Sequence, residues 1–194
     1  VDGNVTLDST YNSYLFMENG SSITGQIINN GGVVVATEGS GTLNITGGIT
    51  RTEEGRGNFY VGYNHFDYGT VNIQSAVEKQ NITVGYYNNA TLQNTLNVTH
   101  EDASIDNSSI TINAGQTLNA NASKITNSTY TNNGTLNFTS GTNANDIIQT
   151  TKGNVQISGD VSNSADIYQA NLQVNDGCTF TNTNTGSLSL SGNE

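Results

Sequence analysis

Residues 95–98 read Thr-Leu-Asn-Val, and close copies of this segment return at 117–120 (Thr-Leu-Asn-Ala) and at 135–138 (Thr-Leu-Asn-Phe). Ten segments share one pattern: a small polar residue, an aliphatic residue, a second polar residue and usually a second aliphatic one. They begin at Asn4, Ser22, Thr42, Thr70, Thr95, Thr117, Thr135, Asn154, Asn171 and Ser187. A strand that recurs about every twenty residues is typical of a β-solenoid, in which short strands stack as rungs.

The alternation within each segment assigns one side chain to the interior and the next to the surface. The aliphatic second position is predicted to form an inward column: Val5, Ile23, Leu43, Val71, Leu96, Leu118, Leu136, Val155, Leu172 and Leu188. The polar third position is predicted to face outward: Thr6, Thr24, Asn44, Asn72, Asn97, Asn119, Asn137, Gln156, Gln173 and Ser189. If the rungs stack in register, about 4.8 Å apart, the outward amides can hydrogen-bond from one rung to the next.

The composition suits a narrow core. Of the 194 residues only 33% are hydrophobic, the mean hydropathy is −0.41, and there is no proline to interrupt a strand ladder. A solenoid needs only a few inward side chains per rung, unlike a globule with one central core. The sequence therefore predicts an all-β β-solenoid of about ten rungs over residues 1–194, either a single domain or a fragment of a longer solenoid, with a β-sandwich as the alternative fold.

Two stretches carry a family resemblance. Residues 60–64 (Tyr-Val-Gly-Tyr-Asn) lead into 69–73 (Gly-Thr-Val-Asn-Ile), and residues 84–90 (Val-Gly-Tyr-Tyr-Asn-Asn-Ala) lead into 95–98. This resembles the passenger repeat of type V secreted (autotransporter) bacterial surface proteins, and the close match covers about residues 41–99. The resemblance implies a right-handed parallel β-helix and an extracellular, cell-surface location. It implies function less sharply, because that family includes adhesins, proteases and aggregation factors.

The charge balance excludes two kinds of partner. Five basic residues stand against sixteen acidic ones, for a net charge of −11. No basic patch can form, so we expect neither nucleic acid nor an anionic membrane surface as partner. No stretch approaches the ~20 apolar residues that span a bilayer, so we expect no membrane insertion of this segment.

The sequence offers little for catalysis. Its only histidines, His65 and His100, do not accompany a recognisable nucleophile, and most carboxylates fall in turns. The cluster Glu101, Asp102 and Asp106 has calcium-ligand chemistry, but a solvated acidic loop is the simpler interpretation. We therefore predict a non-enzymatic protein with no catalytic residue, cofactor or metal; a carbohydrate-active enzyme is the less favoured alternative.

A binding surface is predicted around a charged insertion, residues 51–57, and the tyrosine-rich turns that follow it. Insertions give relief to a smooth solenoid, and tyrosine offers rigid contact area. The predicted surface comprises Arg51, Glu53, Glu54, Arg56, Tyr60, Tyr63, Phe66, Tyr68, Tyr86 and Tyr87. The expected partner is a protein or glycan on a host or neighbouring cell, or another copy of the chain. A plainer interpretation is that the tyrosines only stack on one another along a corner.

The function predicted from these features is that of an adhesin segment, or of the stalk that presents an adhesin. The alternative is a structural subunit of an extracellular filament or surface layer, assembling by strand addition or end stacking. Such a subunit can be glycosylated, because Asn-x-Ser/Thr occurs eleven times, at Asn4, Asn19, Asn44, Asn81, Asn89, Asn97, Asn107, Asn121, Asn127, Asn133 and Asn137.

Overall fold

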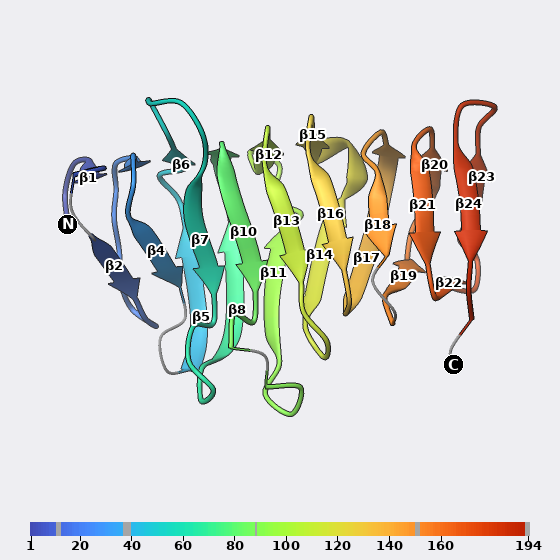
Figure 1. The fold of residues 1–194 in the computed structure, drawn as a ribbon, viewed down its shortest axis with the longest axis horizontal. Helices are drawn as coiled ribbons and strands as arrows, with labels where there is room; N and C mark the ends of the chain where they lie inside the picture. Colours follow the sequence, from blue (N-terminus) through green and yellow to red (C-terminus); the bar gives the residue numbers. More distant parts are fainter. Residues whose placement is uncertain (11–12, 37–39, 88, 150–151, 193–194) are drawn as a thin grey trace.

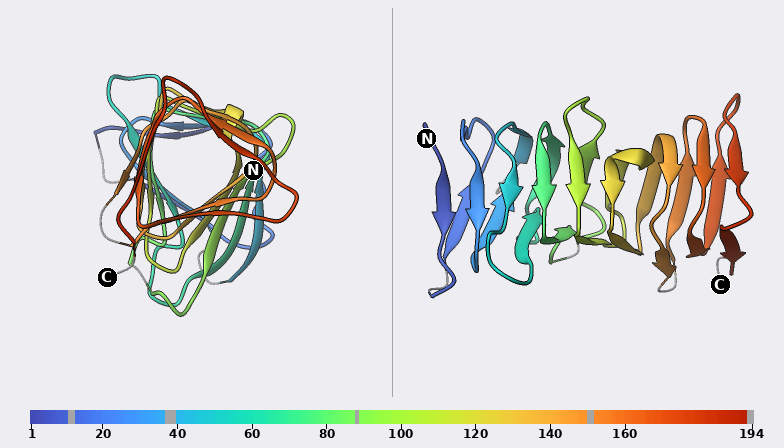
Figure 2. Two further views of the ribbon diagram at one scale, coloured as in Figure 1. Left: turned by 90° about the vertical axis from the view of Figure 1, so that its right-hand side faces the viewer. Right: turned by 90° about the horizontal axis from the view of Figure 1, so that it is seen from above.

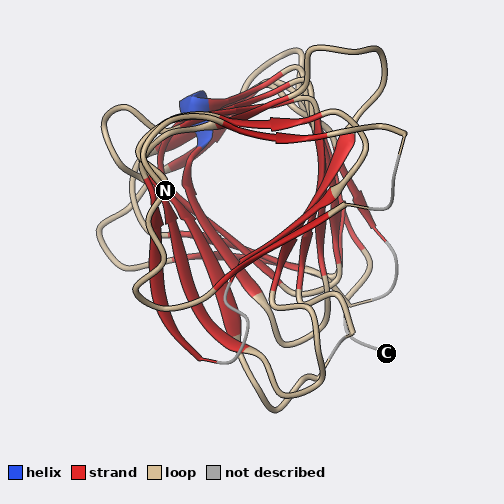
Figure 3. Cartoon of the chain, turned by 90° about the vertical axis from the view of Figure 1, so that its left-hand side faces the viewer, coloured by secondary structure: helices blue, strands red, loops and turns tan. Residues whose placement is uncertain are grey.

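The computed structural model describes residues 1–10, 13–36, 40–87, 89–149 and 152–192, and it is a parallel β-solenoid of about eight turns. The strands lie side by side along one long axis, with the two termini at opposite ends (Figure 1). Seen from above, the same strands follow one another along that axis, and seen from its ends the chain winds around three sides (Figures 2 and 3). Each side is a parallel sheet, and we call them face 1, face 2 and face 3 in the order in which each turn visits them.

Face 1 consists of β1 (Val5–Leu7), β3 (Ile27–Asn29), β6 (Ile49–Thr50), β9 (Ala76–Glu78), β12 (Ser104–Asp106) and β15 (Ile125–Thr126). It is continued by residues 141–143, which end the long strand β17 (Thr135–Asn143), and then by β20 (Val161–Asn163) and β23 (Phe180–Asn182). Face 2 consists of β2 (Tyr14–Met17), β4 (Val33–Ala36), β7 (Gly57–Val61), β10 (Gln80–Val84), β13 (Ser109–Ile112), β16 (Thr129–Asn132), β18 (Ile147–Gln149), β21 (Asp166–Gln169) and β24 (Ser187–Leu190). Face 3 consists of β5 (Ser40–Ile45), β8 (Tyr68–Ile73), β11 (Asn94–Val98), β14 (Thr117–Asn121), β17 (Thr135–Asn143), β19 (Asn154–Ile157) and β22 (Asn171–Val174). A short 3-10 helix, η1 (Ala122–Lys124), follows β14.

Seven of the ten repeated segments form the strands of face 3. The strand pairing matches Thr42, Thr70, Thr95, Thr117 and Thr135 one to the next, and it continues through Asn154 to Asn171. All pairings between described strands are parallel, which excludes the β-sandwich.

Three of the ten segments do not belong to this column. The segment at Asn4 forms β1 on face 1, the segment at Ser187 forms β24 on face 2, and the segment at Ser22 is not a strand. Inward–outward alternation occurs on all three faces, so the pattern alone cannot tell one face from another. The count of turns is accordingly about eight, fewer than the ten expected from the segments.

The inward column on face 3 is confirmed over its length. Leu43, Val71, Leu96, Leu118 and Leu136 pair in register and are all buried in the single hydrophobic core. Leu188 also pairs with an inward residue, Ile167, but on face 2. It lies in the last described turn and stays 38% exposed, because no described rung covers it.

The outward amides form the predicted ladder over five consecutive rungs. Each side-chain Nδ2 donates to the Oδ1 of the preceding rung: Asn72 to Asn44 (2.8 Å), Asn97 to Asn72 (2.8 Å), Asn119 to Asn97 (2.8 Å) and Asn137 to Asn119 (2.9 Å). Ser158 ends the series by donating from Oγ to Asn137 Oδ1 (2.8 Å). The ladder fixes the register of the rungs from outside while the aliphatic column fixes it from inside.

We expect Asn97→Ala to destabilise the solenoid by about 1–2 kcal/mol, because it removes one hydrogen bond on each side of the rung. Thr95→Ala, on the same strand but outside the ladder, is the matched control and should cost less. The measurement is the urea midpoint followed by circular dichroism. Equal midpoints for the two variants would show that the ladder contributes nothing to stability.

Candidate binding surface

The two V-G-Y turns begin where β7 and β10 end, at the corner between faces 2 and 3. Gly62 and Gly85 each adopt a left-handed φ of 75°, and each donates its backbone N–H to the previous turn, to Ala36 O (2.9 Å) and to Val61 O (2.8 Å). A Cβ on Gly62 would lie 2.4 Å from the side chain of Asn94. Glycine therefore permits the sharp turn. The next residue in each turn, Tyr63 or Tyr86, points outward at an equivalent position.

The aromatic side chains gather into one network, which we call the aromatic patch. It comprises Tyr14, Phe16, Tyr60, Tyr63, His65, Tyr86 and Tyr87. Tyr60 stacks on Tyr86 with ring centroids 4.1 Å apart, and Tyr63 stacks on both, at 5.8 Å and 5.3 Å. Tyr87 meets Tyr63 and Tyr86 edge to face, at 5.3 Å and 4.8 Å. Such stacked and perpendicular pairs are the favoured geometries of aromatic rings.

Tyr14 and Phe16, two members of the patch that the sequence interpretation missed, come from the first turn of the solenoid. They stack on each other along β2 (5.8 Å), and Phe16 reaches Tyr63 across the intervening rung (6.2 Å). That rung supplies Val35, which pairs with Phe16 on one side and Tyr60 on the other and is fully buried. The alternation Tyr14-Leu15-Phe16-Met17 was the available signal, since it places both aromatic rings on one side of a strand.

The plainer interpretation, tyrosine stacked on tyrosine, is correct for the inner part of this network. Its outer part remains open to solvent: Tyr86, Tyr87 and Phe16 are 40–45% exposed. Phe66, at the tip of the first turn, is 81% exposed. Large apolar side chains exposed side by side in this way mark surfaces that contact other molecules.

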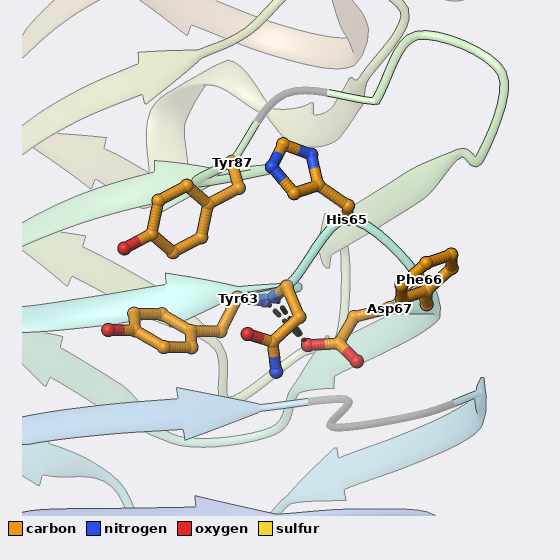
Figure 4. A pocket seen from close by; sticks show the side chains of 6 residues that line it. Tyr63, His65, Phe66, Asp67 and Tyr87 are labelled. Atoms are coloured by element: carbon orange, nitrogen blue, oxygen red, sulfur yellow. Dashed lines mark hydrogen bonds between the residues drawn. The ribbon is translucent and has the colours of Figure 1, made fainter.

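A hollow opens beside the patch, lined by Tyr63, Asn64, His65, Phe66, Asp67 and Tyr87 (Figure 4). Its only carboxylate, Asp67, is 4% exposed and accepts the backbone N–H groups of Tyr63 (3.0 Å) and Asn64 (2.7 Å). Asp67 therefore holds the turn in shape. Figure 4 shows the rings of Tyr63 and Tyr87 extending to one side of this turn and Phe66 to the other.

Packing changes the acidity of the patch. Burial, followed by the neighbouring Tyr86, Tyr63 and Tyr14, raises the pKa of Tyr60 to about 12. The pKa of Tyr63 is also raised, chiefly by its hydrogen bond with Tyr87. The hydroxyl groups of Tyr60 and Tyr63 therefore stay neutral at physiological pH and can both donate and accept hydrogen bonds.

In an alkaline titration followed by tyrosinate absorbance, we expect Tyr60 to ionise near pH 12, well after exposed tyrosines. Because the folded pKa lies above the unfolded value, the stabilisation linked to Tyr60 is complete below about pH 10 and falls as the pH rises towards 12. Tyr60→Phe should remove one late-titrating group. An unchanged late component in that variant would contradict the packing described here.

The charged insertion lies apart from the patch. Residues 51–56 precede β7, whereas the tyrosine turns follow β7 and β10, so the two features sit at opposite ends of strands about 15 Å long. Arg51 donates to Glu54 O (2.8 Å) and lies 3.9 Å from Glu53, and Arg56 donates to Asn107 O (2.9 Å). Tyr68 begins β8 on face 3, outside the ring network of the described residues. Of the predicted surface, the structure thus brings together Tyr60, Tyr63, Tyr86 and Tyr87, with Phe66 in the turn beside them.

The sequon asparagines include two contrasting groups. Asn44, Asn97 and Asn137 belong to the amide ladder, and the Nδ2 atoms of Asn97 and Asn137, where a glycan would be attached, already donate to neighbouring rungs. Asn107 and Asn127 lie in turns with left-handed backbone. A glycan on a turn asparagine leaves the ladder intact, whereas one on Asn97 or Asn137 breaks it.

The described residues offer no metal centre, since they contain no group of three His, Cys, Asp or Glu side chains placed to hold an ion. Asp106, from the acidic cluster, accepts instead from Thr126 Oγ1 (2.7 Å) and Asn127 Nδ2 (2.8 Å), and these bonds lower its pKa. His100 lies 3.9 Å from Asp102 within one exposed turn. Within the described ranges, no helix is long and apolar enough to cross a membrane.

Comparisons with protein-family models, with curated proteins and with solved structures gave no significant match. The class of protein is therefore defined by the strand pairing itself, and it is the parallel β-solenoid.

Proposed function

We propose that this chain is a non-enzymatic binding segment of an extracellular cell-surface protein, an adhesin segment of the autotransporter passenger type. The observation that carries the proposal is the aromatic patch, a connected and partly exposed group of rings, with the exposed Phe66 lining the hollow beside it. Tyrosine-rich surfaces of this kind supply contact area at low conformational cost.

Two further features support this function. The V-G-Y turns that give the passenger resemblance are the same turns that project Tyr63 and Tyr86 from the corner. The remainder of the body is an elongated stack of polar rungs, which suits a spacer that holds a binding surface away from a cell. The buried Val35 beneath the rings gives the patch a rigid base, so little order has to be gained on binding.

The proposal is tested by coating beads with the chain and counting their attachment to host or neighbouring cells. Tyr63→Ala combined with Tyr86→Ala should reduce attachment at least tenfold, because hot-spot aromatic side chains contribute about 2 kcal/mol or more each. Tyr168→Ala is the matched control: Tyr168 is 49% exposed on the same face near the other end of the solenoid. Circular dichroism confirms that each variant is folded, and undiminished attachment of the double variant would refute the proposal.

A second candidate, a filament or surface-layer subunit, is favoured by the last described turn. Its inward-facing side chains Val174, Leu188 and Leu190 are 38–47% exposed, and its strands pair on one side only among the described residues. Such an end can accept a further rung by stacking. Sedimentation of the purified chain distinguishes the candidates: concentration-dependent fibres that Leu188→Lys abolishes would favour the subunit, whereas a monomer favours the adhesin segment.

A further inference from the structure

The aromatic patch lies on an acidic molecule, away from its lysine and arginine side chains. Arg51, Arg56 and Lys79 lie at the corner between faces 1 and 2, at the opposite end of face 2 from the tyrosine turns. Lys124 lies in η1, between faces 3 and 1. Lys152 shares the corner of the patch, but it lies three turns further along, about 14 Å away.

Three of the five lysine and arginine side chains are also engaged elsewhere. Arg51 and Arg56 donate to backbone carbonyls at 2.8 Å and 2.9 Å, and Lys124 donates to Glu101 O. A second copy would therefore bring a net charge of −11 and few available cations to this surface. Like-charge repulsion disfavours the chain itself as the occupant.

The ring geometry favours a small planar cation over a sugar. Tyr60, Tyr63 and Tyr86 cover one another's faces, with interplanar angles of 8–22°, so they leave no broad flat platform for a pyranose ring. Tyr87 stands nearly perpendicular to this stack, and Phe66 projects from the turn. A guanidinium group can lie on one exposed ring and donate its N–H groups to neighbouring phenol oxygens.

We propose that the aromatic patch and Phe66 bind arginine-rich segments of a partner protein. This inference rests on the proposed binding function and names the chemistry of its partner. The ring faces attract the cation, and the acidic surroundings, including the exposed Glu18 that directly follows β2, raise the local concentration of basic segments.

The experiment measures the affinity of two fluorescent peptides by anisotropy, one with five Gly-Arg repeats and one with five Gly-Lys repeats, at a near-physiological salt concentration. The arginine peptide should bind the natural chain several-fold more tightly than the lysine peptide of equal charge. Phe66→Ala combined with Tyr87→Ala should weaken the arginine peptide by roughly five- to thirtyfold, the loss of two cation–π contacts. Tyr168→Ala, the matched control, should leave the affinity unchanged.

Equal affinity for both peptides, an unchanged affinity in the double variant, or no binding to the natural chain would each overturn the inference. These outcomes are separable from failure of the proposed function, because bead attachment is measured on the same variants. If the double variant loses attachment but keeps its peptide affinity, the binding surface stands and its cationic partner is wrong. Attachment that a neutral oligosaccharide inhibits would assign a glycan instead.

Discussion

Leu96→Asp should destabilise the solenoid by about 4 kcal/mol or more, which is enough to unfold its central turns. Leu96 is fully buried in the middle of the inward column, between Val71 and Leu118 of the adjacent rungs. The substitution removes packed methyl groups and places a carboxyl group where only aliphatic side chains surround it. The loss of stability is measured as the shift in the urea midpoint.

Two controls calibrate that result. Leu96→Val removes one methylene but keeps the side chain apolar, and it should cost about 1 kcal/mol. Asn97→Asp places the same carboxylate one residue along, where it faces outward and can still accept from Asn119 Nδ2, so it should be much milder than Leu96→Asp. Equal tolerance of aspartate at both positions would mean that the inward and outward columns are misassigned.

Gly159→Ala should cost about 3 kcal/mol, because the chain has no room for a methyl group at this corner. A Cβ on Gly159 would lie 1.9 Å from the carbonyl oxygen of Thr139 in the preceding turn, and neither group can move without separating two rungs. Gly177→Asn is the control, since Gly177 has open space and a φ of 77° that asparagine tolerates. If both variants unfold at the same urea concentration, the result would contradict the close packing of Gly159 against Thr139 of the preceding turn.

The sequence predicted face 3 in detail because its rungs repeat nearly the same four residues. Identical alternation over seven strands fixes which side chains point inward, and a run of asparagine at one position predicts the amide ladder. The strands of faces 1 and 2 do not repeat one sequence, so their inward positions could not be predicted in the same way. Their inward positions include Asn29, Gln80, Asn132 and Gln169, which are all buried.

These buried amides escape a pattern based on hydrophobicity, because their partners are distant in the sequence. Asn29 Nδ2 donates to Gln80 Oε1 (3.0 Å) across 51 residues, and Asn132 Nδ2 donates to Gln169 Oε1 (2.7 Å) across 37. Each of these bonds pairs two polar atoms that would otherwise be costly to bury. Only the stacking of the turns brings such side chains together.

Only part of the candidate site could be predicted from the sequence, because some of its contacts also depend on how the turns stack. The V-G-Y turns signal that Tyr63 and Tyr86 leave the same corner one turn apart. The contribution of Phe16 depends on two rungs of stacking over Val35, which no local pattern contains. The insertion at Arg51–Arg56 closely precedes the tyrosine turns in sequence, but β7 lies between them and places the two features at different corners.

The claim that the aromatic patch is the contact surface is tested most directly by hydroxyl-radical footprinting of the natural chain, free and attached to the cells that it binds. We expect attachment to reduce the oxidation of Phe66, Tyr86 and Tyr87, which are 40–81% exposed in the free chain. Tyr168, 49% exposed near the other end of face 2, should be oxidised equally in both states. Protection of Tyr168 or Leu190, with unchanged oxidation of the patch, would contradict the account and place the contact at the end of the solenoid.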